Sequence, residues 1–175
     1  MPATSLDPAA FIKDVPDFPK KGIVFKDITP LLGNPAAFTA AIDRMAEPFK
    51  DAGISYVAGI ESRGFLLAAP LACLLKAGLV PIRKKGKLPR KTKSASYALE
   101  YGQDCIEAHE DAFPAGAKVL LVDDVLATGG TAKAACELIE AIGGQVVGVS
   151  LLIELDFLNG RANLAGRDVR ALVKY

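Results

Sequence analysis

Two adjacent carboxylates, followed by a short run of small and hydroxyl-bearing residues, carry the most specific chemical signal in this sequence. Asp123 and Asp124 end an apolar run that begins at Val119, and the phosphate loop follows them: Ala127, Thr128, Gly129, Gly130 and Thr131. Carboxylates accept hydrogen bonds from the hydroxyls of a diol. Glycines let backbone N–H groups approach an anion, threonines add donors, and a helix N-terminus favours negative charge. The order predicts a site for a phosphorylated sugar.

Other interpretations of this segment explain fewer of its residues. A plain strand-to-helix turn capped by Asp124 would need neither the second acid nor the paired threonines and glycines. The segment also lacks the Gly-Lys-Ser/Thr of a nucleotide-binding P-loop and the GxGxxG of a dinucleotide turn.

A second candidate segment, Glu61-Ser62-Arg63-Gly64, follows the apolar run Tyr56–Ile60. An arginine beside backbone N–H groups at a helix start can bind a diphosphate. An arginine in a loop more often forms a surface ion pair, so this segment gains its meaning from the first one.

A third feature is the basic segment, residues 83–93, which contains seven cations and no acid: Arg83, Lys84, Lys85, Lys87, Arg90, Lys91 and Lys93. The whole chain carries +1 and this segment +7, so the remaining residues together carry −6. Such a segment is typical of a mobile flap that closes on a polyphosphate. A nucleic-acid patch is the alternative, but it lacks interleaved aromatic residues, and the near-neutral total argues against an extended nucleic-acid surface.

Short apolar runs alternate with helical patterns, and this order predicts how these residues are positioned. The predicted strands are 56–60, 79–82, 118–122, 145–153 and 169–173; the predicted helices begin at Pro35 and span 65–76 and 131–142; residues 96–100 and 104–109 form a hairpin. This alternation is typical of a single α/β domain over residues 1–175, with a mainly parallel sheet flanked by helices. We expect the ligand outside the carboxyl ends of the strands, in the loops after residues 60, 82 and 122.

The segment Val119–Thr131 resembles the phosphoribosyl-diphosphate (PRPP) binding motif of the type I phosphoribosyltransferases. Four further segments resemble the adenine-using members of that family: 18–30, 83–89, 97–102 and 153–161. Together these matches cover about residues 15–161. The resemblance also implies a small hood at residues 1–33, a flexible catalytic flap and hairpin at 83–109, and a strained cis peptide near Glu61-Ser62.

The resemblance implies three sets of site residues. The PRPP- and AMP-binding set is Glu61, Ser62, Arg63, Gly64, Arg83, Lys84, Lys87, Asp123, Asp124, Ala127, Thr128, Gly129, Gly130 and Thr131. The catalytic set is Glu100, Arg63, Lys87 and Tyr101, with Glu100 as general acid or base. The adenine-binding set is Val24, Phe25, Lys26, Ala127 and Leu155. The family pattern has arginine where this chain has Lys26, which matters if that side chain touches a phosphate.

The resemblance further implies a purine salvage enzyme that converts adenine and PRPP to AMP and diphosphate. Mg²⁺ would be held mainly by PRPP and diphosphate oxygens, so no dedicated protein metal site is expected. An apolar helix after Arg63 predicts a homodimer. The alternatives are a phosphoribosyltransferase for xanthine, hypoxanthine or guanine, a non-catalytic PRPP-binding regulator, and a sugar-diphosphate synthase, although we find no ATP motif for the last.

The cysteines and the apolar runs of the sequence bear on its compartment. Cys73, Cys105 and Cys136 are odd in number and widely spaced, which favours a reducing, cytoplasmic location. Cys105 and His109 stand four apart, as a helical metal pair would, but the residues between them alternate as in a strand. We see neither a signal peptide nor an apolar run long enough for a membrane span, and we expect neither a membrane nor a nucleic acid as partner.

Overall fold

The computed structural model describes residues 6–99 and 102–175, and it divides into two compact units, Met1–Arg44 and Met45–Tyr175. The first unit contains a 3-10 turn, η1 (Pro8–Phe11), and a short antiparallel pair, β1 (Lys13–Pro16) and β2 (Val24–Asp27). The rings of Phe18 and Phe25 meet edge to face with centroids 5.1 Å apart. α1 (Thr29–Leu32) follows β2.

The predicted amphipathic helix is confirmed as α2 (Pro35–Ala46), which crosses the boundary between the two units. The side chain of Asn34 accepts a hydrogen bond from the Ala37 N–H at 3.0 Å, as an N-cap residue does. Proline occupies the first helical position, where its missing N–H leaves no backbone bond unmade. The helix ends before Pro48, which falls in the 3-10 turn η2 (Glu47–Phe49).

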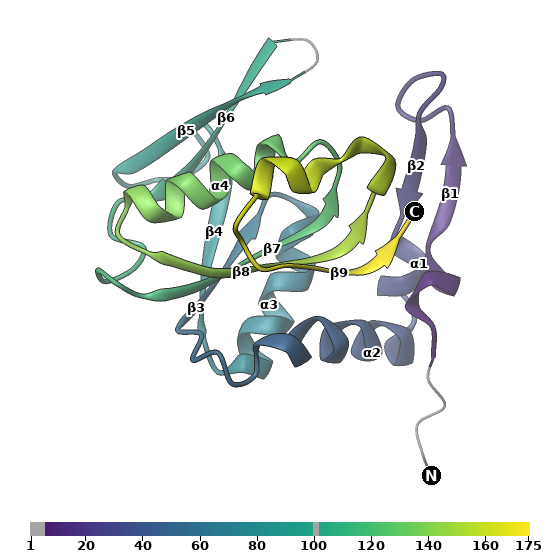
Figure 1. Cartoon of the computed structure of the whole chain (residues 1–175), viewed down its shortest axis with the longest axis horizontal. Coiled ribbons are helices and arrows are strands. Elements are labelled where there is room, and N and C mark those ends of the chain that lie inside the picture. The colour runs from purple at the N-terminus through teal and green to yellow at the C-terminus, as the bar shows by residue number, and fades with distance from the viewer. Residues whose placement is uncertain (1–5, 100–101) are drawn as a thin grey trace. The chain divides into compact units, whose positions relative to one another are not determined.

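The second unit is an α/β layer structure built on a seven-stranded sheet (Figure 1). Its elements, in chain order, are β3 (Tyr56–Ile60), α3 (Arg63–Leu75), β4 (Gly78–Lys84), β5 (Thr92–Leu99), β6 (Gly102–His109), β7 (Lys118–Leu126), α4 (Gly130–Ala141), β8 (Gln145–Glu154), η3 (Asp156–Leu158), η4 (Gly160–Leu164) and β9 (Val169–Lys174). The strand order is β5-β6-β4-β3-β7-β8-β9. Strands β4, β3, β7, β8 and β9 run parallel, and β6 runs antiparallel to β4 and β5.

The chain reverses its direction across the sheet between β3 and β7. From β3 it crosses through α3 to β4 on one side, and from β7 it crosses through α4 to β8 on the other. Because such crossovers are right-handed, α3 and α4 cover opposite faces (Figure 1). The carboxyl ends of β3 and β7 therefore adjoin at a switch point, where ligands of such sheets bind.

Helix α3 packs closely against strand β3 of the sheet. Leu67, Ala68 and Leu71 on α3 are buried, and a Cβ added at Gly59 of β3 would lie only 2.7 Å from Ala68 Cβ. The helix is apolar nearly all round, yet Leu66 and Leu74 remain exposed in the single chain. The apolar character of α3 thus exceeds what this sheet covers.

Strand β7 is longer than its sequence pattern suggested. We expected it to end at Val122, but parallel pairing with β8 continues through Asp123 to Leu126. Side chains of a strand point away from the sheet plane, so two carboxylates near its end do not interrupt the ladder. The aspartates are therefore held on a rigid strand, and the connection to α4 is only residues 127–129.

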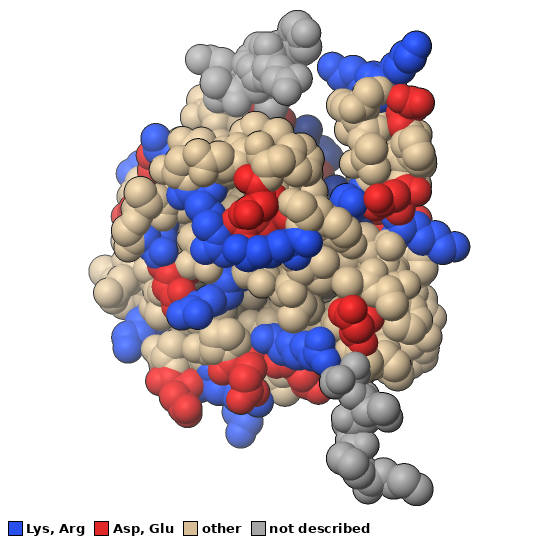
Figure 2. Space-filling model, turned by 45° about the vertical axis from the view of Figure 1, so that its right-hand side comes forward, with Lys and Arg blue, Asp and Glu red and all other residues tan. Residues whose placement is uncertain are grey.

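The described residues contain no helix long and apolar enough to cross a membrane. On the face shown in Figure 2, basic and acidic side chains lie interspersed with uncharged ones. The predicted hairpin is confirmed as β5 and β6, and Cys105 and His109 lie on strand β6, as their alternating neighbours indicated.

Candidate active site at the carboxyl ends of β3 and β7

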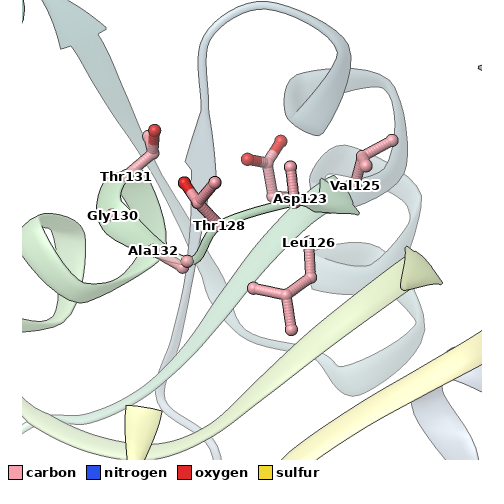
Figure 3. Close-up of a pocket in the computed structure, with 9 residues that line it drawn as sticks. Asp123, Val125, Leu126, Thr128, Gly130, Thr131 and Ala132 are labelled. Carbon is pink, nitrogen blue, oxygen red and sulfur yellow. The ribbon is translucent and has the colours of Figure 1, made fainter. Parts of the chain in front are cut away.

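The phosphate loop forms a small pocket of about 80 Å³ between β7 and α4, lined by Asp123, Val125 and residues 126–132. In Figure 3 the carboxylate of Asp123 and the hydroxyls of Thr128 and Thr131 point the same way. Gly129 has φ +83°, a left-handed conformation that glycine adopts without strain, and it precedes the first turn of α4. The pocket thus combines hydroxyl donors with a helix N-terminus, as an anion site requires.

The turn after β8 supports this loop from outside the pocket. Asn163 donates a side-chain hydrogen bond to the Thr128 carbonyl at 2.7 Å. A Cβ on Gly129 would lie 2.3 Å from the Gly160 carbonyl oxygen, and one on Gly160 would lie 2.2 Å from the Ala127 carbonyl oxygen. The two backbones interlock. Sequence reasoning missed Asn163, because nothing local marks a residue that acts on a loop 35 positions away.

A larger cleft of about 420 Å³ adjoins this pocket and brings together three separate segments. Its lining residues are Ile60, Glu61, Ser62, Arg63, Tyr97, Asp123, Asp124, Val125, Ala127 and Thr131. Both predicted segments, residues 61–63 and 123–131, contribute to it. Tyr97 on β5 was not among the predicted site residues, because only the pairing of the hairpin carries it there.

The two aspartates have different surroundings. Burial and then the charge of Asp124 raise the pKa of Asp123 well above its usual range. Arg63 Nε lies 2.7 Å from Asp124 Oδ2 as an ion pair, but no group in the described part of the chain makes a well-directed hydrogen bond to this buried oxygen. Buried polar atoms are normally hydrogen-bonded. Asp124 Oδ2 is therefore suited to accept a hydrogen bond from a ligand.

The start of α3 sits directly against Asp123. A Cβ on Gly64 would lie 2.9 Å from Asp123 Oδ1 and 3.1 Å from the Val122 carbonyl oxygen. Only glycine lets the two predicted segments approach this closely. The Glu61–Ser62 peptide bond is cis, as the family resemblance implied.

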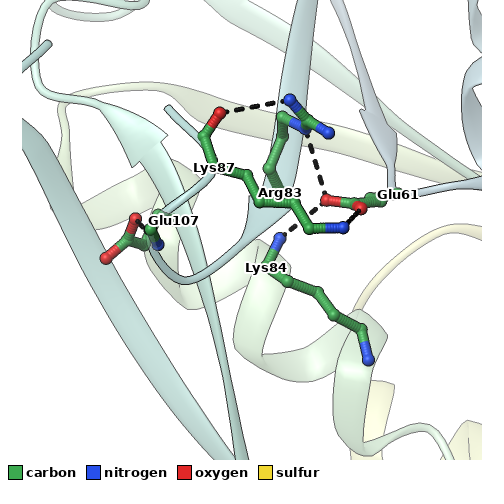
Figure 4. A network of polar contacts seen from close by, with 6 residues as sticks. Glu61, Arg83, Lys84, Lys87 and Glu107 are labelled. Atoms are coloured by element: carbon green, nitrogen blue, oxygen red, sulfur yellow. Dashed lines mark hydrogen bonds and ion pairs between the residues drawn. The ribbon is translucent and has the colours of Figure 1, made fainter. Parts of the chain in front are cut away.

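Glu61 lines the cleft, and its carboxylate also contacts the base of the basic segment (Figure 4). Its carboxylate accepts hydrogen bonds from Arg83 Nε at 3.3 Å, from the Lys84 backbone N–H at 3.0 Å, and from Lys87 Nζ. Burial acts to raise the pKa of Glu61, but the bonds from Lys87 and Lys84 outweigh it and hold that pKa below the usual value. Nearby, Glu107 accepts a hydrogen bond from the Gly86 N–H at 3.0 Å. Two acids thus fix the start of the basic segment.

We expect Glu61→Gln to lower the KM for PRPP by up to about fivefold. The amide still accepts a bond from Lys84, but it no longer competes for Lys87, whose half-exposed ion pair is worth at most about 1 kcal/mol. Steady-state kinetics test this, with Glu107→Gln as the matched control that leaves KM unchanged. A tenfold rise in KM for Glu61→Gln would show that the carboxylate itself is needed for binding.

The remaining predicted residues lie as follows. Lys84 Nζ forms an ion pair with Asp104 at 3.1 Å. Leu155 is half-buried after β8, and its N–H donates to the Leu126 carbonyl at 2.9 Å. Val24, Phe25 and Lys26 are on β2, where Lys26 Nζ lies 2.7 Å from Asp14 Oδ1. Glu100 and Tyr101 fall outside the described residues.

Comparison with known proteins places the chain in a family. Residues 28–167 match the model of the phosphoribosyl transferase domain family. The chain is 57% identical over 162 residues to the adenine phosphoribosyltransferase of Thermobifida fusca, covering 93% of this chain and 92% of that protein. A crystal structure of the Rhodothermus marinus adenine phosphoribosyltransferase superposes with a TM-score of 0.94 at 52% identity, over 99% of both chains.

The Saccharomyces cerevisiae enzyme, solved with an imino-altritol bisphosphate and adenine, superposes with a TM-score of 0.90 at 41% identity, over 96% of this chain and 97% of that one. The small-residue loop and the adjacent acid pair lie at the switch point of this sheet, and the chain belongs to the phosphoribosyltransferase family. Within the family it belongs to the adenine phosphoribosyltransferases, the purine salvage enzymes that form AMP from adenine and PRPP.

Proposed function

We propose that PRPP binds across the two pockets, with its ribose diol on Asp123 and Asp124 and its 5-phosphate in the phosphate loop. The observation that carries this proposal is the acid pair, which lies between the phosphate loop on one side and Arg63 on the other. The diphosphate then lies along Ser62, Arg63 and Gly64. The side chain of Glu61 serves this region indirectly, by holding Arg83 and Lys87.

In the proposed reaction, adenine N9 forms a bond to C1 of the ribose while the bond from C1 to the diphosphate oxygen breaks. The electron pair of the broken bond leaves on the diphosphate, where Arg63, Lys84 and Lys87 offset its charge. The N9 proton passes to Glu100, and Tyr101 orders the flap. Little covalent chemistry falls to the protein, so positioning and charge stabilisation provide the catalysis.

We assign adenine to Val24, Phe25, Lys26, Ala127 and Leu155. Two features support this assignment. Ala127 lines both pockets next to the acid pair, and the Leu155 N–H donates a hydrogen bond to the carbonyl of Leu126, the residue that precedes Ala127. Because Lys26 pairs with Asp14, we expect its backbone, rather than its ammonium group, to meet the base.

The donor groups at the site fit Mg²⁺ brought in by PRPP. Mg²⁺ prefers one or two carboxylates together with substrate phosphates and water. Mg²⁺ would therefore be held mainly by oxygens of PRPP and diphosphate, beside the cleft that Asp123 and Asp124 line, and no side chain is assigned to it as a dedicated ligand. When bound, the ion would supply positive charge against the diphosphate.

Removal of Mg²⁺ is expected to abolish AMP formation. With adenine and PRPP present, excess EDTA should reduce the rate at least a hundredfold, because the charge on the leaving diphosphate is then left to the cations of the protein. Adding Mg²⁺ beyond the EDTA should restore the rate. Full activity in EDTA would contradict the metal assignment while leaving the PRPP site in place.

We also propose that the chain works as a homodimer in the cytoplasm. The exposed Leu66 and Leu74 of α3, with Leu79 of β4, support an interface on this helix. Three cysteines without disulfides support a reducing compartment.

A further inference from the structure

A polar chain that includes Tyr97 adjoins the phosphate loop from the hairpin side. The Tyr97 hydroxyl donates to Asp104 Oδ2 at 3.1 Å, and Lys84 Nζ pairs with the same oxygen at 3.1 Å. Tyr97 also interacts with the side chain of Thr131, the last residue of the phosphate loop. It lines the large cleft with Thr131, Asp123 and Asp124. The proposed PRPP contacts account for Lys84 and Thr131 but leave Tyr97 without a role.

The chemistry of this hydroxyl suits a phosphate. Burial raises the pKa of Tyr97, so the phenol keeps its proton at neutral pH and remains a donor. Its present acceptor is a carboxylate, and a phosphate oxygen is also an anionic acceptor. Its neighbour Thr131 is a hydroxyl of the anion pocket. A phosphate oxygen held by Thr131 therefore lies within reach of Tyr97.

We propose that Tyr97 is a further binding residue for the ribose 5-phosphate group, donating its hydroxyl to the phosphate in place of Asp104. This inference rests on the proposed PRPP site and deepens it. In the absence of phosphate, Asp104 accepts the hydrogen bond of the phenol and so positions it. Strand β5 packs against α4, so Tyr97 on this strand reaches the phosphate loop at the N-terminus of that helix.

The test compares the binding of ribose 5-phosphate and of inorganic diphosphate, each measured alone by calorimetry. Tyr97→Phe removes only the hydroxyl and should weaken ribose 5-phosphate binding about tenfold, the effect of one hydrogen bond to a charged group, while diphosphate binding stays the same. The KM for PRPP should rise similarly with little change in kcat. Tyr56→Phe, at the opposite end of β3, is the matched control and should change nothing.

A second variant separates binding from support of the hairpin. If Tyr97 only anchored β5 through Asp104, then Asp104→Asn, which weakens that anchor, should impair ribose 5-phosphate binding as much as Tyr97→Phe does. We expect Asp104→Asn to bind it as tightly as wild type. Equal binding by wild type and Tyr97→Phe, or equal losses in the two variants, would overturn the inference alone. A wild-type protein that binds no ribose 5-phosphate would contradict the proposed site as well.

Discussion

Asp124→Asn is expected to reduce kcat/KM for PRPP by about a hundredfold or more, the effect of losing one preorganised polar contact. Asp124 Oδ2 is buried and lies 2.7 Å from Arg63 Nε, and no group among the described residues makes a well-directed hydrogen bond to it. An amide NH₂ at this position is itself a hydrogen-bond donor, so it could accept a bond neither from the Arg63 guanidinium nor from the ribose hydroxyl. If the amide turns its oxygen to this position instead, the negative charge that holds Arg63 is still lost. Steady-state kinetics with varied PRPP measure the effect, and an unchanged kcat/KM would exclude Asp124 from the site.

For the neighbouring substitution Asp123→Asn, we expect the stability of the fold to rise while activity falls. Because the folded state raises the pKa of Asp123, its ionised form destabilises the fold at neutral pH, and protonation as the pH falls through the raised pKa relieves this. An amide mimics the protonated acid. Asp123→Asn should therefore raise Tm while it lowers activity. In the wild type, lowering the pH should raise the KM for PRPP at pH values where an aspartate with an ordinary pKa is still ionised. A lower Tm for Asp123→Asn would contradict the raised pKa.

Gly129→Ala and Gly160→Ala should each abolish most PRPP binding, lowering kcat/KM by at least a hundredfold. Each new methyl would lie within 2.3 Å of a backbone carbonyl oxygen, 2.3 Å from Gly160 O in the first case and 2.2 Å from Ala127 O in the second. Because both contacts are with backbone, relief requires the phosphate loop and the turn to move apart. Displacement of a positioned loop by about 1 Å has effects of this size.

Gly166→Ala separates this clash from ordinary backbone strain. Gly166 has φ +81°, close to the +83° of Gly129, but no atom lies within 4 Å of an added Cβ. Gly166→Ala should lose about 1–2 kcal/mol of unfolding free energy, the cost of a Cβ in the left-handed region, and no activity. Kinetics and thermal melts of all three variants make the comparison. If Gly129→Ala bound PRPP as Gly166→Ala does, the interlock of loop and turn would not matter for the site.

The sequence allowed the fold and the two loops of the candidate cleft to be predicted, because those parts depend on local patterns. Strand, acid pair, loop and helix occur consecutively from residue 119 to residue 141, and the parallel order of the strands follows from their alternation with helices. The residues that the sequence did not reveal reach the site through contacts between segments that are far apart in the chain. Tyr97 reaches the cleft through the β5–β6 hairpin, and Asn163 supports the loop from a turn after β8.

The ion pairs that the basic segment forms could not be predicted from the sequence either. A run of seven cations suggests an empty binding surface, yet Arg83, Lys84 and Lys87 already pair with Glu61 or Asp104. Glu61 directly follows β3 and Asp104 lies on β6, so only the strand order β6-β4-β3 brings these acids to the basic segment. Likewise, the length of β7 depends on continued pairing with β8, which outweighs the polar character of its last residues.

The most direct test of the central assignment is the rate of nucleotide formation with PRPP, Mg²⁺ and each of four bases: adenine, hypoxanthine, guanine and xanthine. We predict AMP and one equivalent of diphosphate from adenine, with a kcat/KM at least a hundredfold above that of any 6-oxopurine, since a site built for the adenine edge leaves polar groups unpaired with the others. A higher kcat/KM for hypoxanthine, guanine or xanthine than for adenine, or binding of PRPP without turnover of any base, would contradict it.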